Sequence, residues 1–420
     1  MDRLAALQRA PEHFVDTAAM ARLPAKARRG FLRQAFAAAL AGGAATLARA
    51  EDGEAAILEP TEAARGLGAP VALDGYGKPS KYEATLQRRQ SPGLTQTRQA
   101  SVSFCPLQGL FGIVTPSGLH FERHHQGWWD IDPRTHRLML NGSDARMLKR
   151  PLVFTVDELM RLPSVSRFHF IECGANTAME WGNVAVPTVQ YTHGMLSCSE
   201  FTGVPLITLL EMAGADLPRG RFVLAEGGDG SGMTRTIPMD LVRSGEVLVA
   251  YGQDGEMLRR IELGDAPYGT KDETLHYVDL MPDGRHRQYS SIQEVKSVIT
   301  TPSGGQVLLQ RGFHAISGLA WSGRGKIARV DVSVDGGRNW REARLQTPVM
   351  SKCLTRFSAD WVWKGEPALL MSRAIDGTGQ VQPSYPQLRA ARGRRSIYHN
   401  NAMQTWWVQQ SGEVSNVQLS

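Results

Sequence analysis

Apolar runs of strand length alternate with turn residues throughout the C-terminal part of the chain. Residues 312–321, 327–334 and 361–372 are rich in apolar side chains, and each run has the length of a β-strand. Asp335, Gly336 and Gly337 follow one of these runs, and Asp-Gly between apolar runs is typical of a hairpin turn. Repeated short strands with such turns predict a β-sandwich over residues 291–420.

The middle of the chain combines short strands with short helices. Thr155 and Glu158 have the spacing of a capping box, which predicts a helix that begins near residue 155. A second helix is predicted over residues 206–213. The apolar residues 168–171 predict a short strand that ends at a tight turn. Together with the sandwich, this pattern predicts the α+β fold class, with a separate domain over residues 101–290.

Charge changes the interpretation of the N-terminal part. Of the formal net charge of +6, +5 lies in residues 1–50, which contain eight Lys/Arg and three Asp/Glu. The run from Arg28 to Arg33 precedes an Ala- and Leu-rich stretch and an Ala-Arg-Ala site, as in a twin-arginine signal peptide for export to the periplasm. An Ala-rich amphipathic helix is the alternative. Residues 51–100 are rich in turn residues, and we expect an irregular arm.

The charge outside the leader and the spacing of the cysteines limit which partners and cofactors we expect. A charge of only +1 outside the leader argues against a nucleic-acid partner, and the apolar part of the leader is too short for a membrane span. The four cysteines show neither zinc spacing nor a Cys-x-x-Cys-His haem attachment site, so we expect no zinc and no covalent c-type haem. Electrons from a redox reaction would then leave to another protein. The disulfide state of Cys105, Cys198 and Cys353 stays open.

Cys173 is the main candidate for chemistry. The predicted strand at residues 168–171 delivers it into the turn Cys-Gly-Ala-Asn, where small residues allow a ligand to come close. A thiolate presented in this way suits a soft metal centre. The alternative is a buried free cysteine that acts as a small apolar residue.

Three other segments contain polar side chains that are candidates for binding a ligand. Arg123, His124 and His125 form a cluster of donors that could equally be a solvated loop. A glycine-rich loop at residues 225–232 contains Asp229, although most such loops are simple turns. Arginines near the C-terminus, at positions 389, 392, 394 and 395, form a local positive cluster or a solvated loop.

Several of these motifs, in this order, resemble the sulfite oxidase family of molybdopterin enzymes. The resemblance covers roughly residues 100 to 420 and rests on the cysteine turn, on the run from Thr192 to Cys198 and on the run from Thr202 to Pro205. Within the family, the pattern is similar to the molybdenum subunits of sulfane dehydrogenases. It implies a molybdopterin-binding domain over residues 101–290 and an immunoglobulin-like dimerisation domain over residues 291–420, which would form a homodimer.

The resemblance also implies roles for individual residues. Cys173 would be the protein ligand to molybdenum. Arg123, with Arg392 or, in its place, Arg394 or Arg395, would hold an anionic substrate. Tyr277, otherwise a half-buried surface tyrosine, would form a hydrogen bond at the metal centre. The pterin-binding residues would be Phe121, Glu122, Arg123, His124, His125, Cys173 and Asp229.

The implied function is molybdenum-dependent oxidation of sulfane sulfur on a carrier protein, with electrons passed to a c-type cytochrome subunit. A sulfite dehydrogenase is the nearest alternative. A third interpretation follows from residues 258–260, where the resemblance implies the deletion of a family segment that contacts the pterin. If that segment is absent, the chain could be a cofactor-deficient relative that acts as a binding or assembly module.

Overall fold

The computed structural model describes residues 14–16, 79–90, 99–182, 186–229, 231–252, 257–281, 283–288, 292–393, 396 and 398–419. The twin-arginine motif and most of the expected arm lie outside these residues. Near the N-terminus, strand β1 (Phe14–Asp16) pairs with β16 (Gln306–Leu308). From the arm, η1 (Lys81–Glu83) and β2 (Arg89–Gln90) are described, and β2 pairs with a strand of the next domain.

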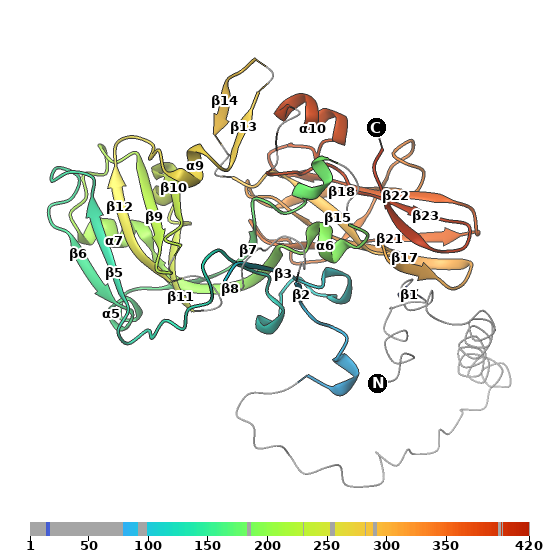
Figure 1. The fold of residues 1–420 in the computed structure, drawn as a ribbon, viewed down its shortest axis with the longest axis horizontal. Helices are drawn as coiled ribbons and strands as arrows, with labels where there is room; N and C mark the ends of the chain where they lie inside the picture. The colour runs from blue at the N-terminus through green and yellow to red at the C-terminus, as the bar shows by residue number, and fades with distance from the viewer. Residues whose placement is uncertain are drawn as a thin grey trace, which may run out of the picture.

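A five-stranded sheet with short helices forms one end of the molecule (Figure 1). Its strands in spatial order are β10 (Thr234–Pro238), β9 (Phe222–Gly227), β12 (Leu258–Gly264), β5 (Arg137–Gly142) and β6 (Leu152–Thr155). Strands β12 and β5 are parallel, and the other neighbours are antiparallel. Strand β12 pairs with β9 and β5 in the centre of this sheet, with a register shift against β9 between Leu258 and Arg260, so the sheet continues at the deletion expected near residue 258.

The helices at this end begin where the sequence predicts. The capping box of Thr155 and Glu158 is present at α5 (Val156–Met160), and the prediction for residues 206–213 corresponds to α7 (Leu206–Met212). Leu206, Leu209 and Leu210 of α7 are buried in the core beneath the sheet. The helices α8 (Met239–Arg243) and α9 (Lys271–Thr274) complete this part.

Two three-stranded sheets occupy the centre of the molecule (Figure 1). One has the order β11 (Leu248–Gly252), β8 (Leu196–Pro205), β7 (Val165–Glu172), and the other β2, β3 (Ser101–Phe104), β4 (Glu122–His124). The expected strand at residues 168–171 is therefore part of a longer strand, β7. Between β7 and β8 the chain forms η4 (Ala178–Trp181) and α6 (Val189–His193).

The predicted β-sandwich forms the other end. One sheet has the order β15 (Lys296–Thr301), β17 (Gly312–Trp321), β21 (Thr355–Trp363), β20 (Arg344–Leu345). The second has the order β19 (Arg341–Glu342), β18 (Ile327–Ser333), β22 (Ala368–Asp376), β23 (Thr405–Val408), β24 (Val414–Val417). The expected strand over residues 361–372 is wrong, because a turn with Gly365 at a φ of 90° divides it between β21 and β22.

The two ends share packing through the central strands. The sandwich core, which contains Trp321, Phe357 and Trp406, also includes Leu196 and Cys198 of β8. Helix α10 (Tyr385–Arg392) and the hairpin of β13 (Val278–Leu280) and β14 (His286–Gln288) lie above this junction in Figure 1. Among the described residues, no helix has both the length and the apolar character needed to cross a membrane.

Candidate functional site

The turn that carries Cys173 is fixed by hydrogen bonds on both sides. Directly after β7, the backbone N–H of Cys173 donates to the carbonyl of Met195 (3.0 Å), and its own carbonyl accepts from the N–H of Asn176 (2.8 Å). The buried Asn176 amide donates to Glu172 Oε1 (3.0 Å) and to the carbonyl of His193 (3.1 Å), and its oxygen accepts from the N–H of Met195 (3.2 Å). The asparagine therefore serves to hold the cysteine turn against the start of β8.

A buried ion pair anchors the same turn to the sandwich. Glu172 Oε1 lies 2.8 Å from Nζ of Lys296, and the side chains are 3% and 2% exposed. The lysine also donates to Thr177 Oγ1 (2.7 Å), and Trp321 Nε1 donates to Glu172 Oε2 (2.8 Å). Because Lys296 and Trp321 belong to strands β15 and β17, the second domain helps to place the thiol.

The C-terminal segment after α10 returns to this turn. The N–H of His399 donates to the carbonyl of Gly174, next to the cysteine, over 2.7 Å. Trp181 Nε1 donates to the carbonyl of Tyr398 (3.1 Å), which ties the same segment to η4. Residues far apart in sequence thus close around the thiol.

The Cys173 thiol lies in a mostly apolar setting with two cations nearby. It packs against the buried apolar cluster of Val102, Phe104 and Met195, and burial raises its pKa. A backbone hydrogen bond from Ala175 and the charges of Arg123 and Arg235 act in the opposite direction. A bound metal cation would add to them, because a coordinating thiol is deprotonated.

Two tyrosines and an arginine lie close enough to the thiol to interact with it electrostatically. The rings of Tyr277 and Tyr398 lie 4.4 Å apart, and the guanidinium carbon of Arg235 lies 4.4 Å above the ring of Tyr277. Burial raises the pKa of Tyr277, the nearby Cys173 raises it further, and Arg235 lowers it. Both hydroxyls are therefore kept protonated as hydrogen-bond donors at ordinary pH.

Strand β4 places the predicted pterin-binding residues beside this cluster. Arg123 is exposed and donates to the carbonyls of Ser101 (3.3 Å) and His124. Glu122 pairs with Arg88 and, over 3.3 Å, with His124. The exposed guanidinium of Arg123 is thus held on the side that faces solvent and the cavity described next.

A cavity of about 670 Å³ opens between β4 and the glycine-rich loop. It is lined by Phe121, Glu122, Arg123, His124, Asp229, Ser117, His120, Gly127, Trp128, Trp129, Asp130, Ile131, Ile171 and Met257. Five of the predicted site residues thus share one cavity. Of these, Phe121 packs against the same apolar cluster as Cys173, and the charge of Arg123 acts on the thiol. The cavity combines an apolar wall with donors that suit a pterin and its phosphate, so the residues present fit a molybdopterin.

Asp229 has hydrogen-bond partners within its own loop, and the pKa of His125 is shifted by its surroundings. The carboxylate of Asp229 accepts from the N–H and hydroxyl of Ser231 and from the N–H of Gly232, so it shapes the glycine-rich loop. Burial lowers the pKa of His125, and Arg123 lowers it further. His125 is therefore favoured as a neutral ring beside the cavity.

Arg392 differs from the other predicted site residues. Its guanidinium is 1% exposed and donates to Asp279 Oδ2 (2.7 Å) and Glu294 Oε2 (3.0 Å). These bonds join α10 to β13 and to the segment before β15. The role of Arg392 at a substrate stays a prediction, and the alternatives Arg394 and Arg395 lie outside the described residues.

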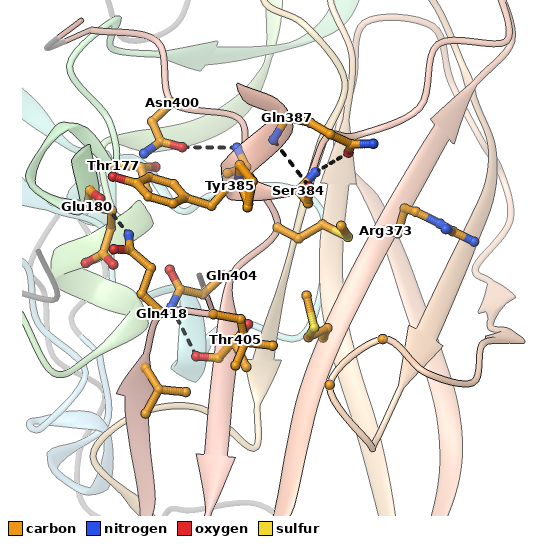
Figure 2. A pocket seen from close by; sticks show the side chains of 18 of the residues that line it. Thr177, Glu180, Arg373, Ser384, Tyr385, Gln387, Asn400, Gln404, Thr405 and Gln418 are labelled. Atoms are coloured by element: carbon orange, nitrogen blue, oxygen red, sulfur yellow. Dashed lines mark hydrogen bonds between the residues drawn. The ribbon is translucent and has the colours of Figure 1, made fainter. Parts of the chain in front are cut away.

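A second pocket, of about 410 Å³, lies beside η4, α10 and β23 (Figure 2). Among the residues that the structure describes, none of the predicted site residues lines it. Glu180 of η4 is buried here, and burial raises the pKa of its carboxyl to about 7. Gln418 donates to the backbone carbonyl of Glu180 over 2.7 Å, as Figure 2 shows, and Asn416 donates to its carboxylate over 3.1 Å.

Sequence reasoning missed Arg235 and the Glu172–Lys296 pair. Arg235 lies in β10 between two threonines, where alternation alone marks it as a solvent-facing strand residue. Lys296 opens a strand whose residues are all buried, and a lysine in such a strand was the available signal. Its partner, Glu172, directly precedes the cysteine.

Comparison with known proteins assigns this chain to a family of enzymes. Residues 125–262 match the family model of the oxidoreductase molybdopterin binding domain. Residues 288–406 match that of the Mo-co oxidoreductase dimerisation domain. The chain belongs to the sulfite oxidase family of molybdopterin enzymes, as the motifs predicted, and this membership implies a molybdenum–molybdopterin cofactor.

Within this family the chain is close to the sulfane dehydrogenases. The crystal structure of the sulfane dehydrogenase SoxCD from Paracoccus pantotrophus matches with 41% identity and a TM-score of 0.81, over 86% of this chain and 98% of that one. Sulfite oxidase from Gallus gallus is 27% identical over 78% of each chain. The mitochondrial sulfite oxidase of Mus musculus is also 27% identical, over 65% of this chain, which spans only 58% of that enzyme.

Proposed function

We propose that this protein oxidises sulfane sulfur carried by another protein, and that a c-type cytochrome subunit takes the electrons. The observation that carries the proposal is the placement of Cys173 among Arg123, Arg235 and Tyr277, next to a cavity suited to a pterin. The similarity to SoxCD supports sulfane sulfur as the substrate. The twin-arginine motif supports the periplasm as the location.

The residues around the cavity would hold the cofactor. The thiolate of Cys173 would bind molybdenum, and Phe121, His124 and Asp229 would contact the pterin. When bound, the cofactor supplies the two-electron oxidation at sulfur. The protein would position both the cofactor and the substrate.

Two arginines and a tyrosine would handle the substrate. The guanidinium groups of Arg123 and Arg235 present planar, positively charged donors, which suit an anionic sulfur group. The hydroxyl of Tyr277 would donate a hydrogen bond at the metal centre. Stacking on Tyr398 and the overlying Arg235 hold its ring in place.

The mouth of the cavity favours a substrate attached to a protein. Trp128 and Trp129 line it and are 70% and 60% exposed. Exposed aromatic side chains beside a polar site are typical of surfaces that contact another protein. A free anion such as sulfite would gain nothing from them.

The decisive experiment is the molybdenum-to-protein ratio after expression in a host that makes the cofactor. We expect a ratio near one for the parent chain and loss of molybdenum in Cys173→Ser, whereas Cys105→Ser, also without a nearby thiol partner, keeps it. Molybdenum retention in Cys173→Ser would refute the metal assignment. Absence of both molybdenum and pterin from the parent would instead support the cofactor-deficient module.

Substrate assays separate the two enzymatic candidates. The sulfite oxidases among the relatives favour sulfite as the second candidate. We expect faster electron transfer to a c-type cytochrome from a carrier protein with sulfane sulfur than from free sulfite. Arg235→Gln should raise the KM for the carrier protein or for sulfite, whichever is the substrate. Its molybdenum content should stay at the parent level. Turnover of sulfite alone would assign the chain as a sulfite dehydrogenase.

A further inference from the structure

Two buried cysteines from different domains meet at the junction. Sγ of Cys198 lies 3.5 Å from Sγ of Cys353, and the residues are 0% and 1% exposed. Cys198 belongs to β8 in the centre of the molecule, and Cys353 lies in the sandwich just before β21. They are 155 residues apart in the chain, so folding alone brings them together.

Both cysteines are held from the backbone. The N–H of Cys198 donates to Thr115 Oγ1 (3.1 Å), and its carbonyl accepts from the N–H of Thr115 (2.8 Å). On the other side, Lys352 adopts a φ of 53°, in the left-handed region that L-residues rarely use. This unusual turn directly precedes Cys353.

The strained turn also forms the contact between the domains. The carbonyl of Lys352 accepts from the N–H of Phe170 in β7 over 3.2 Å, and its ammonium pairs with Glu246. The same residue therefore fixes the turn to the central sheet and aims the next side chain at Cys198. The geometry presents one thiol to another across the domain boundary.

We propose that Cys198 and Cys353 form a disulfide that links the molybdopterin-binding domain to the dimerisation domain. The two thiols lose two electrons and two protons as the Sγ–Sγ bond forms. The oxidant is a small-molecule or protein disulfide, whose S–S bond is cleaved to two thiols by exchange through a mixed disulfide. This inference is independent of the proposed function, because neither residue belongs to the cavity.

The surroundings distinguish this pair from Cys105. The hydrogen bond with Cys353 lowers the pKa of Cys198 and raises that of Cys353, so Cys198 is the better nucleophile of the two. Burial raises the pKa of Cys105 to about 12, against weaker opposing hydrogen bonds from Ser197 and Thr115. Cys105 therefore remains a thiol in the same core.

Burial determines when the bond forms. An oxidant reaches the pair only before the domains dock or when the junction opens locally. The reduced folded protein should exchange slowly, and the oxidised protein should resist reductants until it unfolds. Both properties are measurable on the full chain.

The test is a thiol count by peptide mass spectrometry. The full chain is refolded, or incubated in mild urea, with an excess of oxidised glutathione, and free thiols are then alkylated in denaturant. We expect a linked peptide pair containing Cys198 and Cys353 and a molecule lighter by two hydrogens, with Cys105 and Cys173 alkylated. Four alkylated cysteines under all of these conditions, or a bond of Cys198 to Cys105, would overturn the proposal.

A stability comparison provides a second readout. Oxidised parent protein should unfold at a temperature several degrees above the reduced parent, because the bond closes a long loop. Cys105→Ala, in the same core, should keep this difference between the two redox states. Cys353→Ser should abolish it, and a difference that survives in Cys353→Ser would assign the effect to another site.

Discussion

Replacing Lys296 by Met tests whether the second domain holds the cysteine turn. The substitution keeps most of the stem volume and removes only the ammonium, which lies 2.8 Å from Glu172 and 2.7 Å from Thr177. Both members of the pair are almost completely buried, so the carboxylate would be left without its counter-ion. Breaking a buried ion pair on one side typically costs about 3–5 kcal/mol.

We therefore expect Lys296→Met to lower the free energy of unfolding by about 3–5 kcal/mol, measured by urea denaturation followed through tryptophan fluorescence. The double variant Glu172→Gln with Lys296→Met should recover more than half of that loss, because neither charge remains buried alone. Lys364→Met, at an exposed lysine, is the matched control and should change little. The molybdenum content of the single variant should fall as well, since the turn that carries Cys173 loses its anchor.

Two results of the denaturation experiment would contradict a stabilising ion pair. A Lys296→Met protein within about 1 kcal/mol of the parent would show that the ammonium contributes no net stability at this site. A double variant no more stable than the single variant would assign the loss to the packing of the lysine stem. In either case the ion pair would not be the link between the domains.

Two further predictions concern stability. The pKa of Glu180 is raised to about 7 from an ordinary value of 4.5, so its stabilising protonated form is lost as pH rises through this interval. Glu180→Gln should therefore gain about 3 kcal/mol relative to the parent between pH 4.5 and pH 8, measured by denaturation at both; an unchanged difference would contradict the raised pKa. In Gly203→Ala the new Cβ would lie 2.3 Å from the carbonyl oxygen of Val249. We expect a loss of about 1–3 kcal/mol in thermal or urea unfolding, against no loss in Gly118→Ala, where the space is open.

Local sequence rules accounted for much of the fold. The capping box at Thr155 and the strand over residues 312–321 appear where they were expected, because both depend on neighbours close in sequence. The division of residues 361–372 into two strands was missed, although the four residues Lys-Gly-Glu-Pro at 364–367 interrupt the apolar run and have the composition of a turn. The apolar residues on both sides were grouped into one strand, and the turn between them was overlooked.

Site residues could be predicted from the sequence only where they belong to a contiguous motif. Cys173 and Arg123 were identified from contiguous motifs, and the structure brings them together. Arg235 and Lys296 come from strands with no motif, and only the tertiary fold gives them a role at the thiol. Arg392 shows the converse, because a basic cluster in sequence becomes a buried ion pair with Asp279 and Glu294.

The hydrogen bond from His399 to Gly174 has a consequence for biosynthesis. On the ribosome, the cysteine turn emerges long before His399, the residue that closes it. The finished pocket therefore exists only after His399 has been synthesised, although each domain can begin to fold earlier. Cofactor insertion into the closed site must follow that step, and a chain that stops before His399 would offer molybdenum a loose thiol in place of a formed site.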